Sequence, residues 1–409
     1  MHIVAITGSY YPELMAPSAC INPYLVELAR NADVEVICPL TYYNGSNSTQ
    51  IGSIKIHFVT NWQNSLLTKL NTFVKKKNHV LGLRLIAIIS RCIDYVREFL
   101  MPSPYDSTLV KAYLKVLELL DKQNKIDTIV SVTFPFSTHV VALRFKQKHP
   151  SVKWLSYTTD PLAYNEANPM PSWKKQKAAS IEKEVYDNCD YCLITEELLQ
   201  NVINDYKIPQ SKVVVLPYLL EKENLSIDLK KLNNERPQVT YAGCLFYRVR
   251  NPQKMLRVFS RIKKADLNLF VTGDRICRNI LKRTYPNNIT INDVVPRNEY
   301  LRLLRESDVL INLSNNAKLQ APHKLLELIS TGRPIINFYY HVDSGFKLVE
   351  KYPLGLNVSN SASDDEVVDL ISEFLDVVRG KCIIADEIMK LYPERLLSAQ
   401  MPILLKLIS

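Results

Sequence analysis

The strongest constraint on this chain is an alternation of strand and helix signals that stops once and then starts again. In the first half, short apolar runs of strand length alternate with segments whose apolar residues recur three to four positions apart. After a polar stretch at residues 221–236 (EKENLSIDLKKLNNER), the same alternation resumes. Strands that alternate with helices predict a parallel sheet with helices on both faces. We therefore expect an α/β protein with two doubly wound, Rossmann-like domains.

The individual elements follow from these apolar runs and periodic segments. In the first half, strands are predicted at 2–7, 34–38, 54–59, 127–132, 154–157 and 192–195, with helices at 23–30, 109–120 and 138–148. In the second half, strands are predicted at 239–242, 267–272, 309–313 and 334–338, with helices at 254–262, 299–307 and 324–330.

Domain boundaries follow from the same pattern. The first domain is predicted at residues 1–220 and the linker at 221–236, and the second domain at 237–385. Residues 386–409 form a helical segment that we expect to pack back on the first domain. If the two domains face one cleft, the carboxyl ends of both sets of strands border it, and ligands of open parallel sheets bind at such ends.

The net charge of the chain indicates which kinds of partner it can bind. The chain carries a formal net charge of +10, which favours an anionic partner: nucleic acid, a phosphate-bearing ligand or an anionic lipid surface. Residues 66–100 hold seven basic residues against two acidic ones, with apolar side chains between them. Such a segment either lies on an anionic membrane surface or packs its apolar face on the core. We find no nucleic-acid recognition module and expect no nucleic-acid partner.

The stretch 322–336 (PHKLLELISTGRPII) carries the clearest binding chemistry. Lys324 and Glu327 lie three positions apart and so share one face of a helix. A lysine at the start of a helix can bind phosphate, and a carboxylate can accept hydrogen bonds from two ribose hydroxyls. The alternative is an amphipathic helix whose lysine and glutamate are solvated.

A second candidate follows the strand at 239–242, in the stretch 241–252 (YAGCLFYRVRNP). A turn at Gly243 can bring backbone N–H groups close to a diphosphate, and Arg250 or Arg248 can supply a bidentate donor. We favour Arg250, with Arg248 second; the alternative is a basic surface loop. No G-x-G-x-x-G follows the first strand, which argues against a dinucleotide-dependent dehydrogenase.

Both stretches resemble family-four GT-B glycosyltransferases. Their nucleotide-binding helix often reads Pro-Ser-Lys-Leu, then Glu, then Gly-x-Pro, and the matching residues here are Pro322, Lys324, Leu325, Glu327, Gly332 and Pro334. The resemblance implies that Glu327 binds the donor ribose. Many of these enzymes carry an earlier glutamate at the position that Leu319 occupies here, so the way in which the donor sugar is held departs from the family pattern.

The first half is similar to the acceptor domain of the same enzymes. In the stretch 132–161, a strand is followed by a polar run and later by Asp160-Pro161. The resemblance places Asp160 at the reaction site, as a sugar ligand or as a base for an acceptor hydroxyl. The alternative is a helix-capping or turn aspartate ahead of Pro161. His139 is a further acceptor-side candidate, although a helix-face histidine is the commoner role. The opening loop, 8–19, resembles loops containing Tyr-Pro-Glu, so Gly8 and Glu13 are expected on the acceptor side.

The resemblance implies transfer of a sugar from a UDP- or GDP-linked donor to a lipid-linked or saccharide acceptor, with retention of configuration. No cofactor and no metal are expected. The protein is expected in the cytoplasm, on or near the inner face of the membrane, since we find neither a signal peptide nor a spanning segment. Two alternatives stay open: a nucleotide-sugar 2-epimerase, and a non-catalytic nucleotide-sugar-binding subunit.

Overall fold

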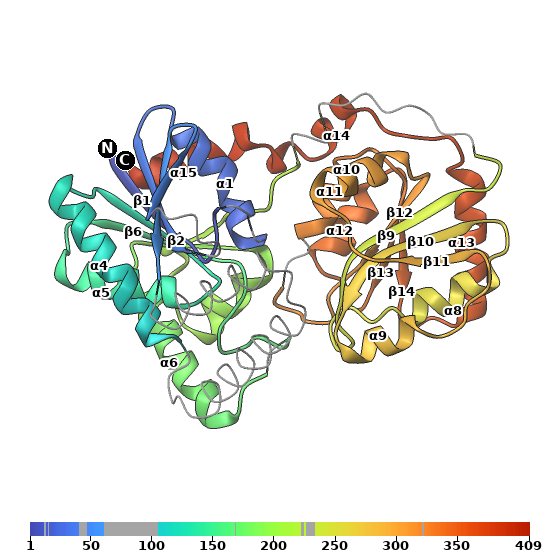
Figure 1. Cartoon of the computed structure of the whole chain (residues 1–409), viewed down its shortest axis with the longest axis horizontal. Helices are drawn as coiled ribbons and strands as arrows, with labels where there is room; N and C mark the ends of the chain where they lie inside the picture. The colour runs from blue at the N-terminus through green and yellow to red at the C-terminus, as the bar shows by residue number, and fades with distance from the viewer. Residues whose placement is uncertain are drawn as a thin grey trace, which may run out of the picture. The chain divides into compact units, whose positions relative to one another are not determined.

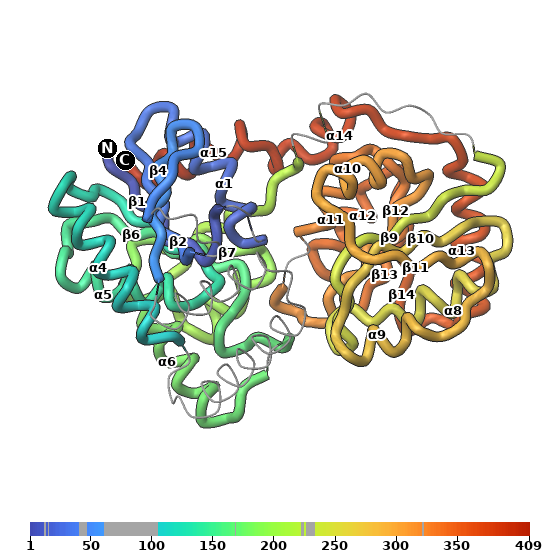
Figure 2. The backbone as a smooth tube through the Cα atoms, viewed as in Figure 1, coloured from blue at the N-terminus to red at the C-terminus, as the bar shows by residue number. Residues whose placement is uncertain are grey.

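The computed structural model describes residues 1–11, 14, 16–40, 47–60, 105–167, 169–221, 225, 234–320 and 323–409. The chain forms two compact units, whose elements are labelled in Figure 1 and whose backbone is traced in Figure 2. Unit 1 comprises Met1–Pro217 together with Met401–Ser409, and unit 2 comprises Tyr218–Gln400.

Unit 1 is an eight-stranded sheet with helices. Its strands are β1 (His2–Ile6), β2 (Asp33–Pro39), β3 (Ser48–Ile51), β4 (Ile54–Val59), β5 (Thr128–Val132), β6 (Lys153–Thr158), β7 (Tyr191–Ile194) and β8 (Val213–Val215). Its helices are α1 (Ala16–Leu28), α4 (Ser107–Gln123), α5 (Ser137–Lys148) and α6 (Ser172–Asn188), with short helical turns at Glu196–Leu198, Asn201–Asp205 and Gln210–Lys212. The last helix, α15 (Leu397–Ile408), ends in residues that belong to this unit.

The strands of unit 1 lie in the order β3-β4-β2-β1-β5-β6-β7-β8. Every neighbouring pair is parallel except β3 and β4. In chain order, β2, β3 and β4 are added to the sheet on one side of β1, and β5 is then added on the other side of β1. This reversal of strand order makes the carboxyl ends of β1 and β5 the expected ligand-binding point of unit 1.

Apolar strands and one buried tyrosine explain why unit 1 folds in this way. Every residue of β1 and of β5 is buried, as expected for central parallel strands covered on both faces. Helix α4 is capped by Asp106, whose carboxylate accepts hydrogen bonds from the N–H groups of Thr108 and Leu109. The buried Tyr113 of α4 donates its hydroxyl to the carbonyl of Thr7 at 2.6 Å, which fixes the start of the loop after β1.

Unit 2 is a six-stranded parallel sheet with helices. Its strands are β9 (Gln238–Leu245), β10 (Asp266–Gly273), β11 (Ile289–Asn292), β12 (Val309–Leu313), β13 (Ile335–Tyr339) and β14 (Gly355–Ser359). Its helices are α8 (Gln253–Arg261), α9 (Arg275–Leu281), α10 (Arg297–Glu306), α11 (His323–Ile329), α12 (Ser344–Lys351), α13 (Asp364–Val377) and α14 (Ala385–Leu391), with a turn at Pro393–Arg395.

The strands of unit 2 lie in the order β11-β10-β9-β12-β13-β14, and all pairs are parallel. Three asparagines occupy matching positions on β12, β13 and β14. The amide of Asn312 donates to Asn337 at 2.7 Å, and the amide of Asn337 donates to Asn357 at 2.8 Å. A one-residue slip of any of these strands would break this ladder of amides, so the ladder helps to fix the register.

The predicted fold class, two doubly wound α/β sheets, is confirmed. The helix predicted at 23–30 is wrong in its start, because α1 begins at Ala16 and contains Pro23. The strands β3, β8, β11 and β14 and the helices α6, α9 and α12 were not predicted. The basic stretch at 66–100 lies outside the described residues, and so does most of the predicted linker. Among the helices of the described ranges, none combines the length and the apolar character needed to cross a membrane.

Candidate functional site

The candidate site of unit 2 lies where its strand order reverses. The chain builds outward from β9 to β10 and β11, and then continues with β12 on the other side of β9. The loops that follow β9 and β12 therefore leave the sheet side by side, in the position where open parallel sheets bind ligands. The predicted donor-site residues come from the end of β9, from the loop that follows it and from α11, the helix after β12.

The loop after β9 is a tight, well-braced turn. The N–H of Arg250 donates to the carbonyl of Phe246 at 2.6 Å, and the two residues form an antiparallel bridge. The N–H of Tyr247 donates to the carboxylate of Asp274 at 2.7 Å. This bracing holds Arg250 half-buried at the base of the loop, whereas Arg248 is exposed between the two bridge residues.

Gly243 marks the close approach of β9 to α11. Its φ of +155° is a value that residues with a side chain rarely adopt, and a Cβ atom there would lie 2.8 Å from the Nζ atom of Lys324. Because Lys324 donates a hydrogen bond to the neighbouring carbonyl of Ala242, its ammonium group cannot withdraw without breaking that bond. Glycine is therefore the residue that fits at this position.

Lys324 and Arg250 form a positively charged pair. The Nε of Arg250 donates to the side-chain oxygen of Asn315 at 2.6 Å, and the N–H of Asn316 bonds the carbonyl of Val249 at 2.9 Å. Burial lowers the pKa of Lys324 to about 8; Arg250 contributes in the same direction, and Glu327 opposes the shift. An anionic ligand would relieve the repulsion between the two cations.

Glu327 is buried on α11 and lies between two partners from α10. Its carboxylate accepts a hydrogen bond from the hydroxyl of Tyr300 at 2.7 Å and forms an ion pair with Arg297. Burial, followed by the charge of Glu327, raises the pKa of Tyr300 well above its usual value, so the hydroxyl remains a donor. The sequence pattern did not point to Tyr300, Arg297 or Asn315, because their link to the site exists only in three dimensions.

In unit 1, Gly8 lies where the loops after β1 and β5 touch. A Cβ atom at Gly8 would lie 1.9 Å from the carbonyl oxygen of Phe134 and 2.4 Å from the Cδ of Pro135. No side chain fits there, and Gly8 therefore allows the two loops to meet at the point where the strand order of unit 1 reverses. Phe134 itself is partly exposed at this point.

Asp160 follows β6, the strand next to β5, and is half-buried. The hydroxyl of Thr159 lies 3.3 Å from its carboxylate, and the N–H of Thr159 donates to the hydroxyl of Thr133 at 3.0 Å. The loops after β5 and β6 are thus tied together. The structure brings Gly8 and the Thr133–Asp160 region to the same edge of the sheet.

His139 lies in the core of unit 1. Its side chain is 0% exposed, and its ring nitrogens contact the hydroxyls of Ser131 at 2.7 Å and Thr158 at 3.0 Å. Burial lowers its pKa to about 3. A neutral, enclosed imidazole with both nitrogens occupied has no access to an acceptor, so the structure argues against the acceptor-side role predicted for His139.

The predicted Glu13 and Pro322 lie outside the described residues, and Leu319 is half-buried.

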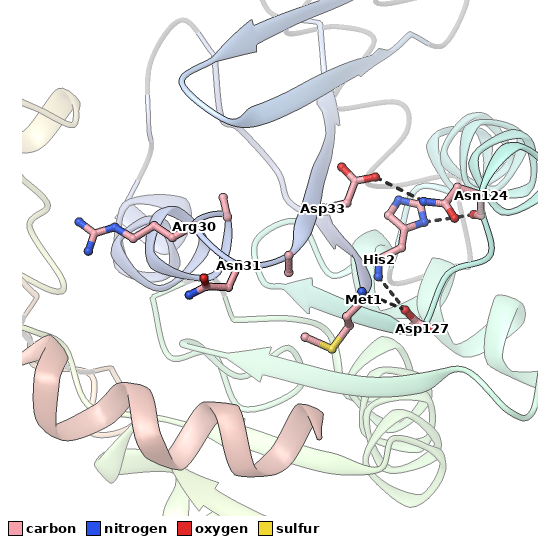
Figure 3. Close-up of a pocket in the computed structure, with 9 residues that line it drawn as sticks. Met1, His2, Arg30, Asn31, Asp33, Asn124 and Asp127 are labelled. Atoms are coloured by element: carbon pink, nitrogen blue, oxygen red, sulfur yellow. Dashed lines mark hydrogen bonds and ion pairs between the residues drawn. The ribbon is translucent and has the colours of Figure 1, made fainter.

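A separate polar pocket lies at the opposite edge of the unit 1 sheet, where β1, β2 and β5 begin (Figure 3). It has a volume of about 500 Å³ and is lined by residues that include His2, Asp33 and Asp127. His2, Asp33 and Glu35 place possible metal-ligand atoms within 4.8 Å of one another. The ammonium of Lys55 already lies 3.6 Å from Glu35 and 3.8 Å from Asp33, so these carboxylates have a cationic partner within the protein.

Comparison with known protein families and with curated protein sequences finds no match to this chain. Solved structures match it over its whole length. Sucrose-phosphate synthase from Thermosynechococcus elongatus is 11% identical, with a TM-score of 0.65 over 99% of this chain and 98% of that one. Anabaena HepE in complex with UDP-glucose is 11% identical, with a TM-score of 0.64 over 100% and 99% of the two chains. The lipopolysaccharide outer core galactosyltransferase WaaB is 12% identical, with a TM-score of 0.62 over 100% and 99%.

Proposed function

We propose that this chain, which has the GT-B fold, is a glycosyltransferase that moves a hexose from a nucleoside-diphosphate sugar to an acceptor. The observation that carries the proposal is the convergence of Arg250, Lys324 and Glu327 at the strand-order reversal of unit 2. Two cations and one carboxylate match the two polar parts of such a donor, its diphosphate and its ribose. The structural neighbours support this choice, since HepE binds UDP-glucose and WaaB is a galactosyltransferase.

In this proposal, unit 2 binds the donor. Glu327 accepts hydrogen bonds from the ribose hydroxyls, and Lys324 and Arg250 bind the diphosphate, with the missing side chain at Gly243 in β9 allowing its close approach. Arg248 is the second candidate for the phosphate. We propose UDP as the first nucleotide to test and GDP as the second.

The chemical step requires that negative charge on the departing nucleoside diphosphate be stabilised. Fixed cations that point at developing charge are effective because they need little reorganisation during the reaction, and the loss of one such donor typically costs about a hundredfold in rate or more. Arg250 is held by Asn315 and Lys324 by Ala242, so both meet this requirement. Asp160 in unit 1 is proposed to bind the sugar or to accept the proton of the acceptor hydroxyl, with retention of anomeric configuration.

The acceptor is proposed to be a lipid-linked sugar or another precursor of a surface polysaccharide, which brings the protein to the inner face of a membrane. The support is the basic composition of residues 66–100 and the likeness to a lipopolysaccharide transferase. Three adjacent lysines, Lys75, Lys76 and Lys77, can contribute about 1 kcal/mol each near an anionic surface. Co-sedimentation with anionic vesicles that is lost at high salt, and lost when all three lysines are changed to Gln, is the expected result.

Calorimetric titration with uridine, UDP and UDP-sugars tests the donor assignment. Glu327→Gln should weaken the binding of uridine and of UDP alike. Arg250→Ala should spare uridine and weaken UDP by about 10-fold to 100-fold, the value of a charged hydrogen bond. Arg248→Ala is the matched control, because it removes the same charge from the same loop at an exposed position.

Equal losses for Arg250→Ala and Arg248→Ala would mean that the loop acts only through its general charge, and unchanged UDP affinity in both would remove the diphosphate assignment. Conversion of the free donor into its 2-epimer would instead identify an epimerase. Donor binding without any turnover would favour a binding subunit, a reading that Leu319 keeps open.

A further inference from the structure

We propose that Tyr300 is the positioning residue of the donor site: its hydroxyl orients Glu327 and its ring holds Lys324, so one side chain sets both the ribose-binding and the phosphate-binding groups. This inference rests on the proposed function. It assigns a role to a residue of α10, a helix that precedes β12 and carries none of the sequence motifs.

The hydroxyl acts on Glu327. Tyr300 is 9% exposed and donates to the Oε2 atom of Glu327 at 2.7 Å. A glutamate has three rotatable side-chain bonds, and a buried carboxylate without a fixed donor can adopt several orientations. The bond from Tyr300 selects one of them and leaves the other oxygen, Oε1, on the side of Arg297, a residue that is half-exposed.

The ring acts on Lys324. The ammonium of Lys324 lies 4.8 Å from the centre of the Tyr300 ring, within the range of a favourable cation–π contact. The same ammonium donates to the carbonyl of Ala242. The ring and the carbonyl therefore hold the ammonium group of Lys324 between them. This group lies beside Gly243 of β9, the strand that leads to Arg250. The guanidinium of Arg297 also lies 5.4 Å from the same ring.

The two functions of Tyr300 can be separated by substitution. Tyr300→Phe removes the hydroxyl and keeps the ring, whereas Tyr300→Leu removes both. Tyr300→Phe should weaken uridine and UDP by the same factor, about 5-fold to 20-fold. Tyr300→Leu should weaken UDP by a further factor of about 3 to 5 that uridine does not show, because the contact with Lys324 is lost as well.

Tyr392→Phe is the matched control. Tyr392 is a buried tyrosine of the same unit, and its hydroxyl donates to the carbonyl of Leu348 at 2.7 Å, so this variant loses a similar hydrogen bond outside the site. It should lower the melting temperature as Tyr300→Phe does and leave both affinities unchanged. In a Glu327→Ala background, Tyr300→Phe should have no further effect on uridine, because the hydroxyl acts through that carboxylate.

Calorimetric titration of these variants with uridine and UDP decides the matter. If Glu327→Gln weakens uridine binding while Tyr300→Phe only lowers the melting temperature, Tyr300 is a structural residue and the inference fails, although the donor assignment stands. If Glu327→Gln itself leaves uridine binding unchanged, the donor assignment fails, and the inference about Tyr300 fails with it. An equal response of uridine and UDP to Tyr300→Leu would remove the role of the ring.

Discussion

At the scale of single residues, the proposed donor site is a set of charges whose partners are already fixed within the protein. Arg250 has Asn315, Lys324 has Ala242 and the Tyr300 ring, and Glu327 has Tyr300 and Arg297. Groups held in this way lose little freedom when a ligand binds, which favours affinity. The arrangement also shifts the proton equilibrium of Lys324.

The lowered pKa of Lys324 predicts a pH dependence of diphosphate binding. Lys324 is a cation below its pKa of about 8 and is increasingly neutral above it. The affinity for UDP should therefore be constant from pH 7 to 7.5 and fall above pH 8, by up to about tenfold per pH unit. Uridine, which has no phosphate, should show no such fall.

Titrating both ligands between pH 7 and pH 8.5, where the uracil base stays neutral, measures this effect, and Lys324→Arg provides the control because arginine keeps its charge throughout the range. A UDP affinity that falls equally in the Lys324→Arg variant would assign the pH dependence to another group.

The single residues also show what sequence could predict about the site. Lys324 and Glu327 were predictable because a spacing of three places them on one helical face. Tyr300 was not predictable, because strand β12 separates its helix, α10, from α11 in the sequence. Its contact with Glu327 depends on how α10 and α11 pack. The burial of His139 was not predictable for a similar reason: the sequence places it after a strand, but α5 turns it toward Ser131 and Thr158 inside the core.

At the scale of elements, buried polar side chains hold the loops that carry the candidate residues through hydrogen bonds. In unit 1 this side chain is that of Glu182 on α6, which is fully buried. Its carboxylate accepts the N–H groups of Leu162 at 2.8 Å and Ala163 at 3.1 Å, and the hydroxyl of Tyr206 at 2.5 Å. These bonds fix the segment that directly follows Asp160.

Replacement of Glu182 by Ala should destabilise unit 1 strongly. At least three buried donors would lose their acceptor, and each unpaired donor costs about 1–3 kcal/mol, so we expect a loss of about 3 kcal/mol or more. Urea unfolding followed by tryptophan fluorescence measures it, because all three tryptophans fall within the sequence of unit 1, at positions 62, 154 and 173.

The control is Glu184→Ala, which removes an exposed carboxylate from the same helix. Faster amide exchange at Leu162 and Ala163 in the Glu182→Ala variant should accompany the loss of stability. If the two variants differ by less than about 0.5 kcal/mol, the typical size of a surface effect, then Glu182 does not anchor this loop.

The elements also explain which parts of the fold could be predicted. The buried strands β1, β5, β9 and β12 gave clear signals, because a buried central strand reads as a mostly apolar run. The missed strands β3, β8, β11 and β14 are three to five residues long, and their residues are mostly half-buried or exposed. Their position depends on pairing with a neighbour, as the asparagine ladder that joins β14 to β13 illustrates.

At the scale of the whole molecule, the two units have the same α/β fold class, and we propose that each binds a different substrate. The described cations at the strand-order reversal of unit 2 suit a phosphate-bearing donor, whereas the corresponding edge of unit 1 carries Gly8, Phe134 and the carboxylate of Asp160. This asymmetry matches an enzyme that takes an anionic donor on one unit and a hydroxyl-bearing acceptor on the other. The basic segment at 66–100 extends the same argument to a membrane-associated acceptor.

Sugar transfer is the central claim, and its direct measurement uses purified protein with isotope-labelled UDP-glucose, UDP-galactose and the corresponding GDP-sugars, together with a lipid-linked saccharide fraction. We predict label in the saccharide product with the anomeric configuration of the donor, and a loss of about a hundredfold or more in rate for Arg250→Ala. Arg248→Ala should lose much less rate than Arg250→Ala, and the reverse order would assign the phosphate contact to Arg248. Tight donor binding without labelled product from any of these donors, across soluble and lipid-linked acceptors, would contradict the claim.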